Sequence, residues 1–214
     1  MAKDRLIVAL DFTSLETALK VARRLRGLVR TVKIGSALFT ACGPEIIGRM
    51  RSIGFRVMLD LKFFDIPSTV ELSCRAAARH RVSMLTVHAS GGPAMLAAAV
   101  RGVHHESRRL RTVPPRVLGV TVLTSVDGER SSALRSRVIA LTRAALQAGC
   151  DGVVASAREA DALRRRFGRR LHLVCPGIRP HGRFPAAPVP SGAAALNDQR
   201  RVCTPRDALA RGAD

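Results

Sequence analysis

Aromatic residues are scarce in this chain: neither tryptophan nor tyrosine occurs among its 214 residues, and phenylalanine occurs only seven times. Proteins that bind single-stranded nucleic acid stack bases on aromatic side chains, so this scarcity argues against that class. No apolar run approaches the roughly 18 residues that a membrane-spanning helix requires. The first residues lead into a strand pattern without the apolar core and cleavage site of a signal peptide, so we expect a cytoplasmic protein with no membrane partner.

Paired cysteines are also missing. The five cysteines are odd in number, widely spaced and form no C-x-x-C motif: Cys42, Cys74, Cys150, Cys175 and Cys203. This spacing argues against a dense disulfide framework and against the paired ligands of a structural zinc site. We interpret these residues as small buried side chains in a reducing compartment, and we expect no metal ion.

Lysine is rare although the chain is strongly basic. Its 36 basic and 16 acidic residues give a formal charge of +20, an excess typical of proteins that bind nucleic acid or anionic surfaces. Lysine occurs only at positions 3, 20, 33 and 62, so 32 of the basic residues are arginines, scattered along the whole chain. This distribution indicates replacement of lysine by arginine rather than a basic face, and nucleic acid is not the partner we expect.

Lys33 and Lys62 both follow predicted strands, where a site that needs a proton donor would retain lysine.

Seven short apolar runs alternate with helical patterns, roughly 20 to 35 residues apart. The predicted strands cover residues 6–10, 31–34, 56–62, 83–88, 117–123, 152–155 and 171–175. The first predicted helix begins near residue 13 or 14. The other predicted helices cover 44–53, 68–80, the alanine-rich stretch after 93, 132–148, 157–167 and 204–211. Continuous apolar strands are typical of parallel sheets covered on both faces, so we predict an α/β fold, either a (β/α) TIM barrel or a doubly wound sheet. No G-x-G-x-x-G motif or P-loop is present, which weakens the nucleotide-binding doubly wound alternative.

Polar side chains stand at the carboxyl ends of six predicted strands. They are Asp11, Lys33, Asp60 with Lys62, His88, Thr124 and Arg179. In a barrel these strand ends converge on one rim, where barrel enzymes place their active sites. The pattern therefore favours a barrel with a charged mouth.

The densest charge lies in residues 60–67, where Asp60, Lys62 and Asp65 follow an apolar strand. Ionised groups are costly to bury unless they are paired and hydrogen-bonded. The stretch is therefore either a structural ion-pair network or an array that holds charge against a ligand. We interpret His88 as a hydrogen-bonded structural residue, with ligand contact as the alternative, and residues 90–92 as a turn.

These residues belong to longer motifs through which the chain resembles the orotidine 5′-phosphate decarboxylase family. The most specific motif is D-x-K-x-x-D-I-P-x-T, from Asp60 to Thr69. Further matching segments follow in family order along essentially the whole chain: 9–11, 32–35, 87–92, 122–125, 151–154, 176–180 and 197–201. A wider group of sugar-phosphate decarboxylases and aldol synthases shares D-x-K-x-x-D but usually lacks the I-P-x-T tail.

The resemblance implies a single barrel domain over residues 1–214, a homodimer, no organic cofactor, and decarboxylation of orotidine 5′-phosphate (OMP) to UMP in de novo pyrimidine biosynthesis. It implies that four residues form the catalytic charge array: Lys33, Asp60, Lys62 and Asp65. It further implies that Asp65, Ile66 and Thr69 reach into the neighbouring subunit's site. The remaining implied substrate-binding residues are Asp11 for the ribose hydroxyls, Thr124 for the pyrimidine, and Arg179 and Gln199 in a loop that closes over the ligand.

The chemistry of these side chains agrees with that activity. Loss of CO₂ leaves a poorly stabilised carbanion at C6 of the pyrimidine, which the ammonium of Lys62 can stabilise and then protonate. The carboxylate of Asp60 would oppose the substrate's own carboxylate in the ground state. Like-charged neighbours need counter-charges, which Lys33 and Lys62 supply.

Three features depart from the family pattern. Phe64 stands where the family usually has a polar or basic residue, and a long flexible loop is predicted at about 180–197. We count seven strands and expect strand 8, with its phosphate-gripping Gly-Arg, and the final helix to be absent, which would impair activity. A sugar-phosphate decarboxylase, or an inactive basic barrel acting as a binding protein, remain the alternatives.

Overall fold

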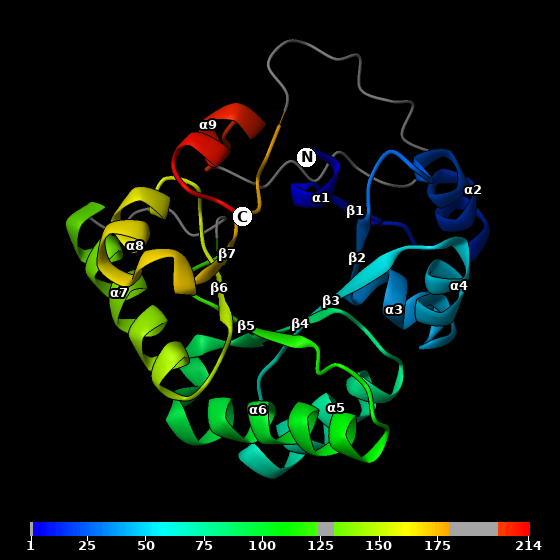
Figure 1. Cartoon of the computed structure of the whole chain (residues 1–214), viewed down its shortest axis with the longest axis horizontal. Helices are drawn as coiled ribbons and strands as arrows, with labels where there is room; N and C mark the ends of the chain where they lie inside the picture. Colours follow the sequence, from blue (N-terminus) through cyan, green and yellow to red (C-terminus); the bar gives the residue numbers. More distant parts are fainter. Residues whose placement is uncertain (1, 124–130, 180–200) are drawn as a thin grey trace.

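The computed structural model describes residues 2–123, 131–179 and 201–214. Its strands form one parallel sheet whose spatial order, β1 to β7, is also their order in the chain. They are β1 (Ile7–Ala9), β2 (Thr31–Gly35), β3 (Arg56–Phe63), β4 (Met84–His88), β5 (Arg116–Val120), β6 (Gly152–Val154) and β7 (His172–Val174). The sheet curls around a common centre with most of the helices outside it (Figure 1), so the prediction of a seven-stranded barrel-type α/β fold is confirmed for the described residues.

Most of the helices lie between consecutive strands in the chain. The helices are α1 (Ala2–Arg5), α2 (Leu15–Leu25), α3 (Ser36–Cys42), α4 (Glu45–Ile53), α5 (Pro67–Arg79), α6 (Gly92–Arg109), α7 (Ser131–Gln147), α8 (Ala160–Phe167) and α9 (Pro205–Ala210), with short 3₁₀ turns at Ala89–Gly91 and Gly168–Arg170. Two predicted boundaries are confirmed in detail. Ser14 caps α2 by accepting a hydrogen bond from the Thr17 amide at 3.3 Å, and Gly54 ends α4 in the left-handed conformation at a φ of 108°.

Other predicted boundaries were wrong. Strand β5 ends at Val120 rather than at residue 123. Helix α8 begins at Ala160 rather than at 157, because Ser156 accepts a hydrogen bond from the Arg158 amide and holds residues 156–159 in a turn. Helices α1 and α3, which are four and seven residues long, were not predicted from the sequence.

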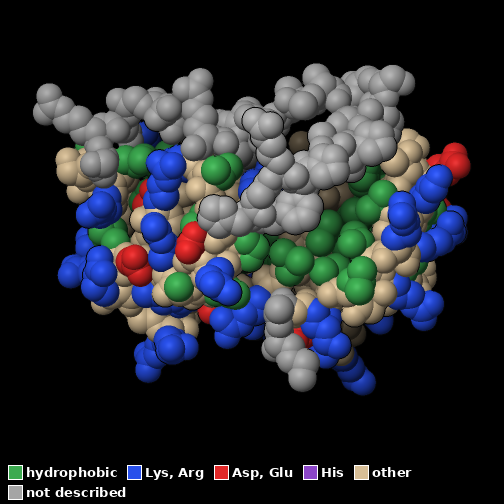
Figure 2. Space-filling model, turned by 90° about the horizontal axis from the view of Figure 1, so that it is seen from above, with side chains coloured by type: hydrophobic (Ala, Val, Ile, Leu, Met, Phe, Trp, Pro, Cys, Tyr) green, Lys and Arg blue, Asp and Glu red, His purple; other side chains and the backbone are tan. Residues whose placement is uncertain are grey.

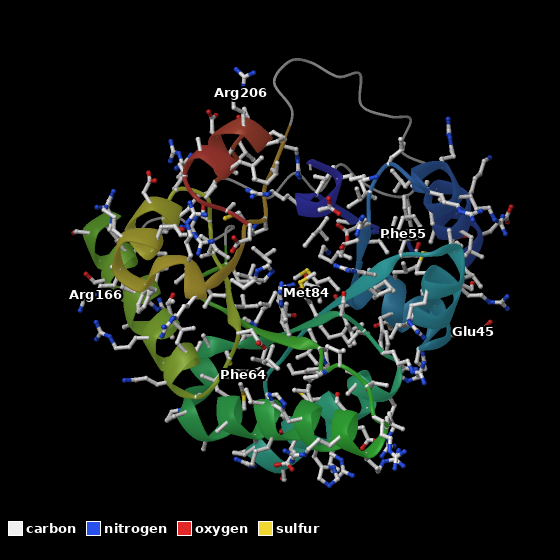
Figure 3. All side chains as sticks on the ribbon, in the orientation of Figure 1. Glu45, Phe55, Phe64, Met84, Arg166 and Arg206 are labelled. Atoms are coloured by element: carbon white, nitrogen blue, oxygen red, sulfur yellow. The ribbon has the colours of Figure 1, made fainter. Side chains whose placement is uncertain are left out.

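Successive side chains of a strand point to opposite faces of the sheet, so they line in turn the inside of the curled sheet and the layer beneath the helices. Met58, Met84 and Leu118 form one buried cluster, and Figure 3 shows Met84 in the middle of the molecule. The neighbouring strand residues 57, 59, 85 and 117 instead belong to the large core between the sheet and the helices. On β3 and β4, the side chains two residues beyond Met58 and Met84 therefore lie on the same inner face. They are closer to the carboxyl ends of the strands than the inner cluster is.

Strands β1 and β7 each pair on one side only within the described sheet. Near β7 the chain returns after α9, and the Asp214 amide donates to the Leu173 carbonyl at 3.0 Å. Figure 2 looks at this side of the molecule and shows hydrophobic side chains gathered over its middle, with Lys and Arg side chains along the lower edge.

Candidate active site

The strand register brings three predicted charged residues onto the inner face of the sheet. Lys33 of β2 is registered with Met58 of β3, and Asp60 stands two residues beyond Met58 on the same face. Asp11 lies just beyond β1, whose Ala9 is registered with Lys33. The sequence-based expectation that these strand ends converge is thus met for the first three strands.

Asp60 is the centre of the cluster. Its Oδ2 accepts a hydrogen bond from Lys62 Nζ at 2.9 Å and forms an ion pair with Lys33 Nζ at 3.5 Å. Lys33 Nζ also donates to Asp11 Oδ1 at 3.0 Å. The Asp60 side chain is 12 % exposed and that of Lys62 35 %, so the acid is largely enclosed while the amine reaches the solvent side. The order Asp11, Lys33, Asp60, Lys62 alternates in sign, which offsets the cost of bringing like charges together.

Lys62 has an unusual backbone. Its φ is 50°, in the left-handed region that costs a non-glycine residue roughly 1–2 kcal/mol. The pairing of β3 with β4 shifts register here: Leu59 is registered with Leu85 and Phe63 with Val87. Three residues of β3 thus face a single residue of β4, Thr86. A bulge of this kind redirects side chains near a site.

Electrostatics favour an ionised Asp60. Burial raises the pKa of its carboxyl group, but the charges of Lys62 and Lys33 and the hydrogen bonds from Lys62 and Thr86 outweigh burial, so the pKa is lowered overall. The pKa of His88 is also lowered, mainly by burial and further by the charge of Lys62. The site therefore combines a carboxylate and an ammonium group beside a neutral imidazole near neutral pH.

His88 contacts Phe64 edge to face, with ring centroids 5.6 Å apart. This is a packing contact, and among the described residues the His88 side chain forms no hydrogen bond, so the predicted hydrogen bond is not found there. Phe64 itself is 62 % exposed, although its position in the family pattern is usually polar.

A cavity of about 1520 Å³ occupies the inside of the curled sheet. Its walls at the catalytic end include Asp11, Lys33, Asp60, Lys62 and Arg179, and it continues to Arg5 and Arg81 at the opposite end. The charged cluster therefore faces a space large enough for a nucleotide.

The structure does not bring every predicted site residue to this cluster. Asp65, Ile66 and Thr69 are exposed, and the Asp65 carboxylate accepts a hydrogen bond from the Ile66 amide at 2.7 Å. Within the described ranges, no ion pair joins Asp65 to either lysine of the cluster. Arg179 is exposed and its backbone amide donates to the Cys203 carbonyl at 2.9 Å. Thr124, Gln199 and the predicted loop at 180–197 lie outside the described residues.

Two residues that were not predicted from the sequence stabilise the carboxyl-terminal end of the sheet. Thr86 is fully buried and hydrogen-bonds both Asp60 and the Lys62 amide. Arg201, 6 % exposed, pairs with Glu159 at 2.8 Å and donates to the Leu123 carbonyl at 3.2 Å, so it joins the segment after β5 to the start of α8. An N-D-Q-R-R segment in the sequence contains Arg201, but nothing in its pattern distinguishes this arginine from the 31 others.

The described part of the chain contains no cluster of three or more His, Cys, Asp or Glu side chains that could hold a metal ion. None of the helices in these described residues is long and apolar enough to cross a membrane.

A curled parallel sheet with a Lys-Asp-Lys cluster inside the carboxyl ends of its strands defines a (β/α)-barrel enzyme. The model of the orotidine 5′-phosphate decarboxylase / HUMPS family matches residues 4–214, and the chain belongs to this family. It is 42 % identical to the orotidine 5′-phosphate decarboxylase of Nitrosococcus oceani, with 100 % of this chain and 88 % of that protein covered. Identity to the enzyme of the same name from Pseudomonas fluorescens strain Pf0-1 is 44 %, covering 98 % of this chain and 86 % of that protein.

Solved structures agree with these relatives. The crystal structure of orotidine 5′-phosphate decarboxylase from Lactobacillus acidophilus superposes with a TM-score of 0.78 at 30 % identity. The superposition covers 98 % of this chain and 87 % of that one.

Proposed function

We propose that this chain is a carboxy-lyase that converts OMP to UMP in pyrimidine biosynthesis. The observation that carries the proposal is the Asp60–Lys62 pair, 2.9 Å apart at the mouth of the cavity, within the D-x-K-x-x-D-I-P-x-T motif. Family membership supports the same activity.

The reaction needs no covalent bond to the protein. The C6–carboxylate bond of the pyrimidine breaks, CO₂ leaves, and the electron pair remains on C6. The Lys62 ammonium, fixed by Asp60, stabilises this negative charge and then donates a proton to C6, which leaves a neutral amine that regains a proton from water. In this mechanism Asp60 faces the departing carboxylate, so that its negative charge disfavours the bound substrate relative to the transition state.

Lys33 and Asp11 complete the charge balance of the site. Lys33 lies between the two carboxylates and pairs with both, while Asp11, whose side chain is 66 % exposed, can accept hydrogen bonds from ribose hydroxyls. Thr124, Arg179 and Gln199 are proposed for the pyrimidine and phosphate ends of the ligand on the basis of their positions in the family motifs.

The direct test compares three proteins: the parent chain, Lys62→Ala, and Lys20→Ala, whose exposed lysine lies on α2. UMP formation from OMP is followed chromatographically. We expect turnover in the parent and in Lys20→Ala and at least a thousandfold loss in Lys62→Ala, because both charge stabilisation and proton transfer disappear. Equal turnover in all three proteins would contradict the proposed role of Lys62, and no turnover in the parent would contradict the activity.

We further propose that the enzyme works as a homodimer in which each subunit contributes Asp65, Ile66 and Thr69 to its partner's site. All three are exposed on the segment that leads from β3 into α5, and Ile66 is 64 % exposed. An apolar side chain in that position is well suited to burial against a second copy.

Mixing two inactive variants tests the shared site. Every site of a Lys62→Ala homodimer lacks Lys62, and every site of an Asp65→Asn homodimer lacks Asp65. A mixed dimer has one intact site. Random re-association of equal amounts should restore about a quarter of the parent's sites. Activity that stays at the level of the separate variants would mean that Asp65 acts within its own subunit or not at all.

A further inference from the structure

The bulge in β3 leaves a polar backbone group without a ladder partner. Leu59 is registered with Leu85 and Phe63 with Val87, so residues 60–62 face Thr86 alone. The Lys62 amide donates its hydrogen bond not to a carbonyl of β4 but to the side-chain oxygen of Thr86, at 3.0 Å. A hydroxyl therefore takes the place of a main-chain acceptor at the point where the backbone of Lys62 has its positive φ.

The same hydroxyl has a second partner. Thr86 Oγ1 donates to Asp60 Oδ1 at 2.9 Å, and the side chain of Thr86 is fully buried. A hydroxyl has one hydrogen to donate and lone pairs to accept, so these two bonds use its donor and one acceptor position. Its rotation is therefore fixed by both neighbours at once.

The two oxygens of Asp60 are consequently divided. Oδ1 is held by Thr86, and Oδ2 is left for the two amines, with Lys62 Nζ at 2.9 Å and Lys33 Nζ at 3.5 Å. A carboxylate held by one oxygen alone could rotate and exchange its partners. The hydroxyl removes that freedom and keeps Oδ2 directed at Lys62.

We propose that Thr86 is a positioning residue for decarboxylation, which holds the backbone of Lys62 and the carboxylate of Asp60 in a single arrangement. The proposal rests on the proposed function, since Thr86 acts through these two residues and touches neither the ligand nor the reacting atoms. Replacing the hydroxyl by a methyl group leaves one donor and one acceptor unpaired in a largely enclosed site.

The charged and titratable groups around Asp60 come from three strands: Lys33 from β2, Lys62 from β3 itself and His88 from β4, with Asp11 beyond β1. Burial raises the pKa of Asp60, whereas the charge and hydrogen bond of Lys62, the charge of Lys33 and, to a smaller extent, the hydrogen bond from the Thr86 hydroxyl lower it. Loss of this hydroxyl therefore raises that pKa, and the acid limb of the pH–rate profile moves to higher pH.

The test uses Thr86→Val, which has the same shape without the hydroxyl, and Thr86→Ser, which keeps it. Thr142→Val is the matched control, because Thr142 is equally buried but hydrogen-bonds the Val138 carbonyl within α7. We expect kcat to fall about ten- to a hundredfold in Thr86→Val with a smaller change in KM, and Thr86→Ser to recover most of the loss. Thr142→Val should keep the parent's kcat and pH profile.

A second readout does not depend on turnover. Carboxyl-carbon NMR titration of Asp60 should give a higher pKa in Thr86→Val than in the parent, Thr86→Ser or Thr142→Val. If the parent fails to decarboxylate OMP, the proposed function is wrong, and this titration still decides the role of Thr86. An unchanged kcat with an unchanged Asp60 pKa in folded Thr86→Val would overturn the proposal, and so would a Thr86→Ser variant as impaired as Thr86→Val. If Thr86→Val does not fold, Thr86→Ala is measured in its place with the same two criteria.

Discussion

Asp60 receives hydrogen bonds or ion pairs from Lys62, Lys33 and Thr86, and only 12 % of its side chain is exposed. Two of these three partners carry positive charge, and each occupies a different strand. A carboxylate held in this way keeps its charge and its direction when the rest of the site changes. The chemistry proposed for Lys62 therefore depends on neighbours as much as on Lys62 itself.

Lys33→Met tests that dependence at a single residue. It removes the positive charge between Asp11 and Asp60 while keeping the length of the side chain. The loss of a charge-assisted hydrogen bond should reduce kcat/KM roughly ten- to a hundredfold and raise the pKa of Asp60. Steady-state kinetics as a function of pH measure both effects, with the exposed Lys20→Met as control. If the variant keeps the parent's kcat/KM and the acid limb of the parent's pH–rate profile, Lys33 is not a counter-charge for Asp60.

At this scale the sequence predicted the charged residues and missed the uncharged one. A lysine or aspartate at the end of an apolar run is conspicuous because burial of an unpaired charge is costly. Thr86 is inconspicuous because threonine is common inside strands. Its importance follows from the bulge in β3, which no residue pattern in 60–62 reveals.

Helices α5 and α6 pack unusually closely. A Cβ atom at Gly102 of α6 would lie 2.5 Å from the Glu71 carbonyl oxygen and 3.3 Å from Cys74 Cβ. We expect Gly102→Ala to destabilise the protein by about 1–3 kcal/mol through overpacking. Gly48→Ala in α4, where a Cβ meets nothing within 4 Å, should instead stabilise it by up to about 1 kcal/mol. Urea denaturation measures both, and a neutral Gly102→Ala would show that the two helices separate without cost.

The same helix pair contains a buried carboxylate. Glu106 is fully buried and accepts hydrogen bonds from Arg79, Arg109 and Arg75. The bonds from Arg79 and Arg109 lower its pKa to about 2, against the opposing effect of burial. Because the folded-state pKa is lowered, Glu106 stabilises the protein above its unfolded-state pKa, and this contribution is lost as the pH falls toward about 2.

Thermal unfolding as a function of pH tests this linkage. Glu106→Gln should have a lower Tm than the parent near neutral pH, and the difference should close as the pH approaches about 2. Glu71→Gln serves as control because Glu71 pairs with Arg101 across the same two helices in a more exposed position. A Tm difference that does not change with pH would mean that Glu106 acts through packing rather than through its charge.

Elements with a strong local signal were predictable, and short ones were not. The apolar runs located all seven described strands, and capping residues located α2, α4 and α9. Helix α3 directly follows β2 after Gly35 and has only seven residues, too few to show a helical period. The end of β5 was misjudged because the apolar pattern continues through Val122 after the hydrogen-bond ladder has stopped.

The molecule as a whole carries a formal charge of +20. Self-repulsion of so many like charges destabilises a compact state, and salt screens it. Raising NaCl from about 10 mM to about 150 mM shortens the screening length from about 30 Å to about 8 Å, so we expect Tm to rise. Differential scanning fluorimetry at several salt concentrations measures the effect. A fall in Tm would mean that surface ion pairs outweigh the net repulsion.

The barrel-type fold was predictable from the repeated β-α pattern, but the sequence alone left a doubly wound sheet open. Both architectures bury parallel strands on both faces, so both give the same apolar runs. The strand order decides between them, because a doubly wound sheet reverses direction at a switch point whereas this sheet follows the chain from β1 to β7. Strand order depends on contacts between distant residues, which short-range patterns do not encode.

That strand order has a consequence for how the molecule opens. Every ladder in the described sheet joins strands that are consecutive in the chain, so each pairing closes a loop of only a few tens of residues at modest entropic cost. Strand β4 has partners on both sides and two further strands beyond each partner, whereas β1 and β7 have one partner each. Local opening should therefore begin at the two outer strands and progress inward. In native-state hydrogen exchange, we expect amides of β3 to β5 to exchange most slowly and those of β1 and β7 fastest, with the strands between them in graded order.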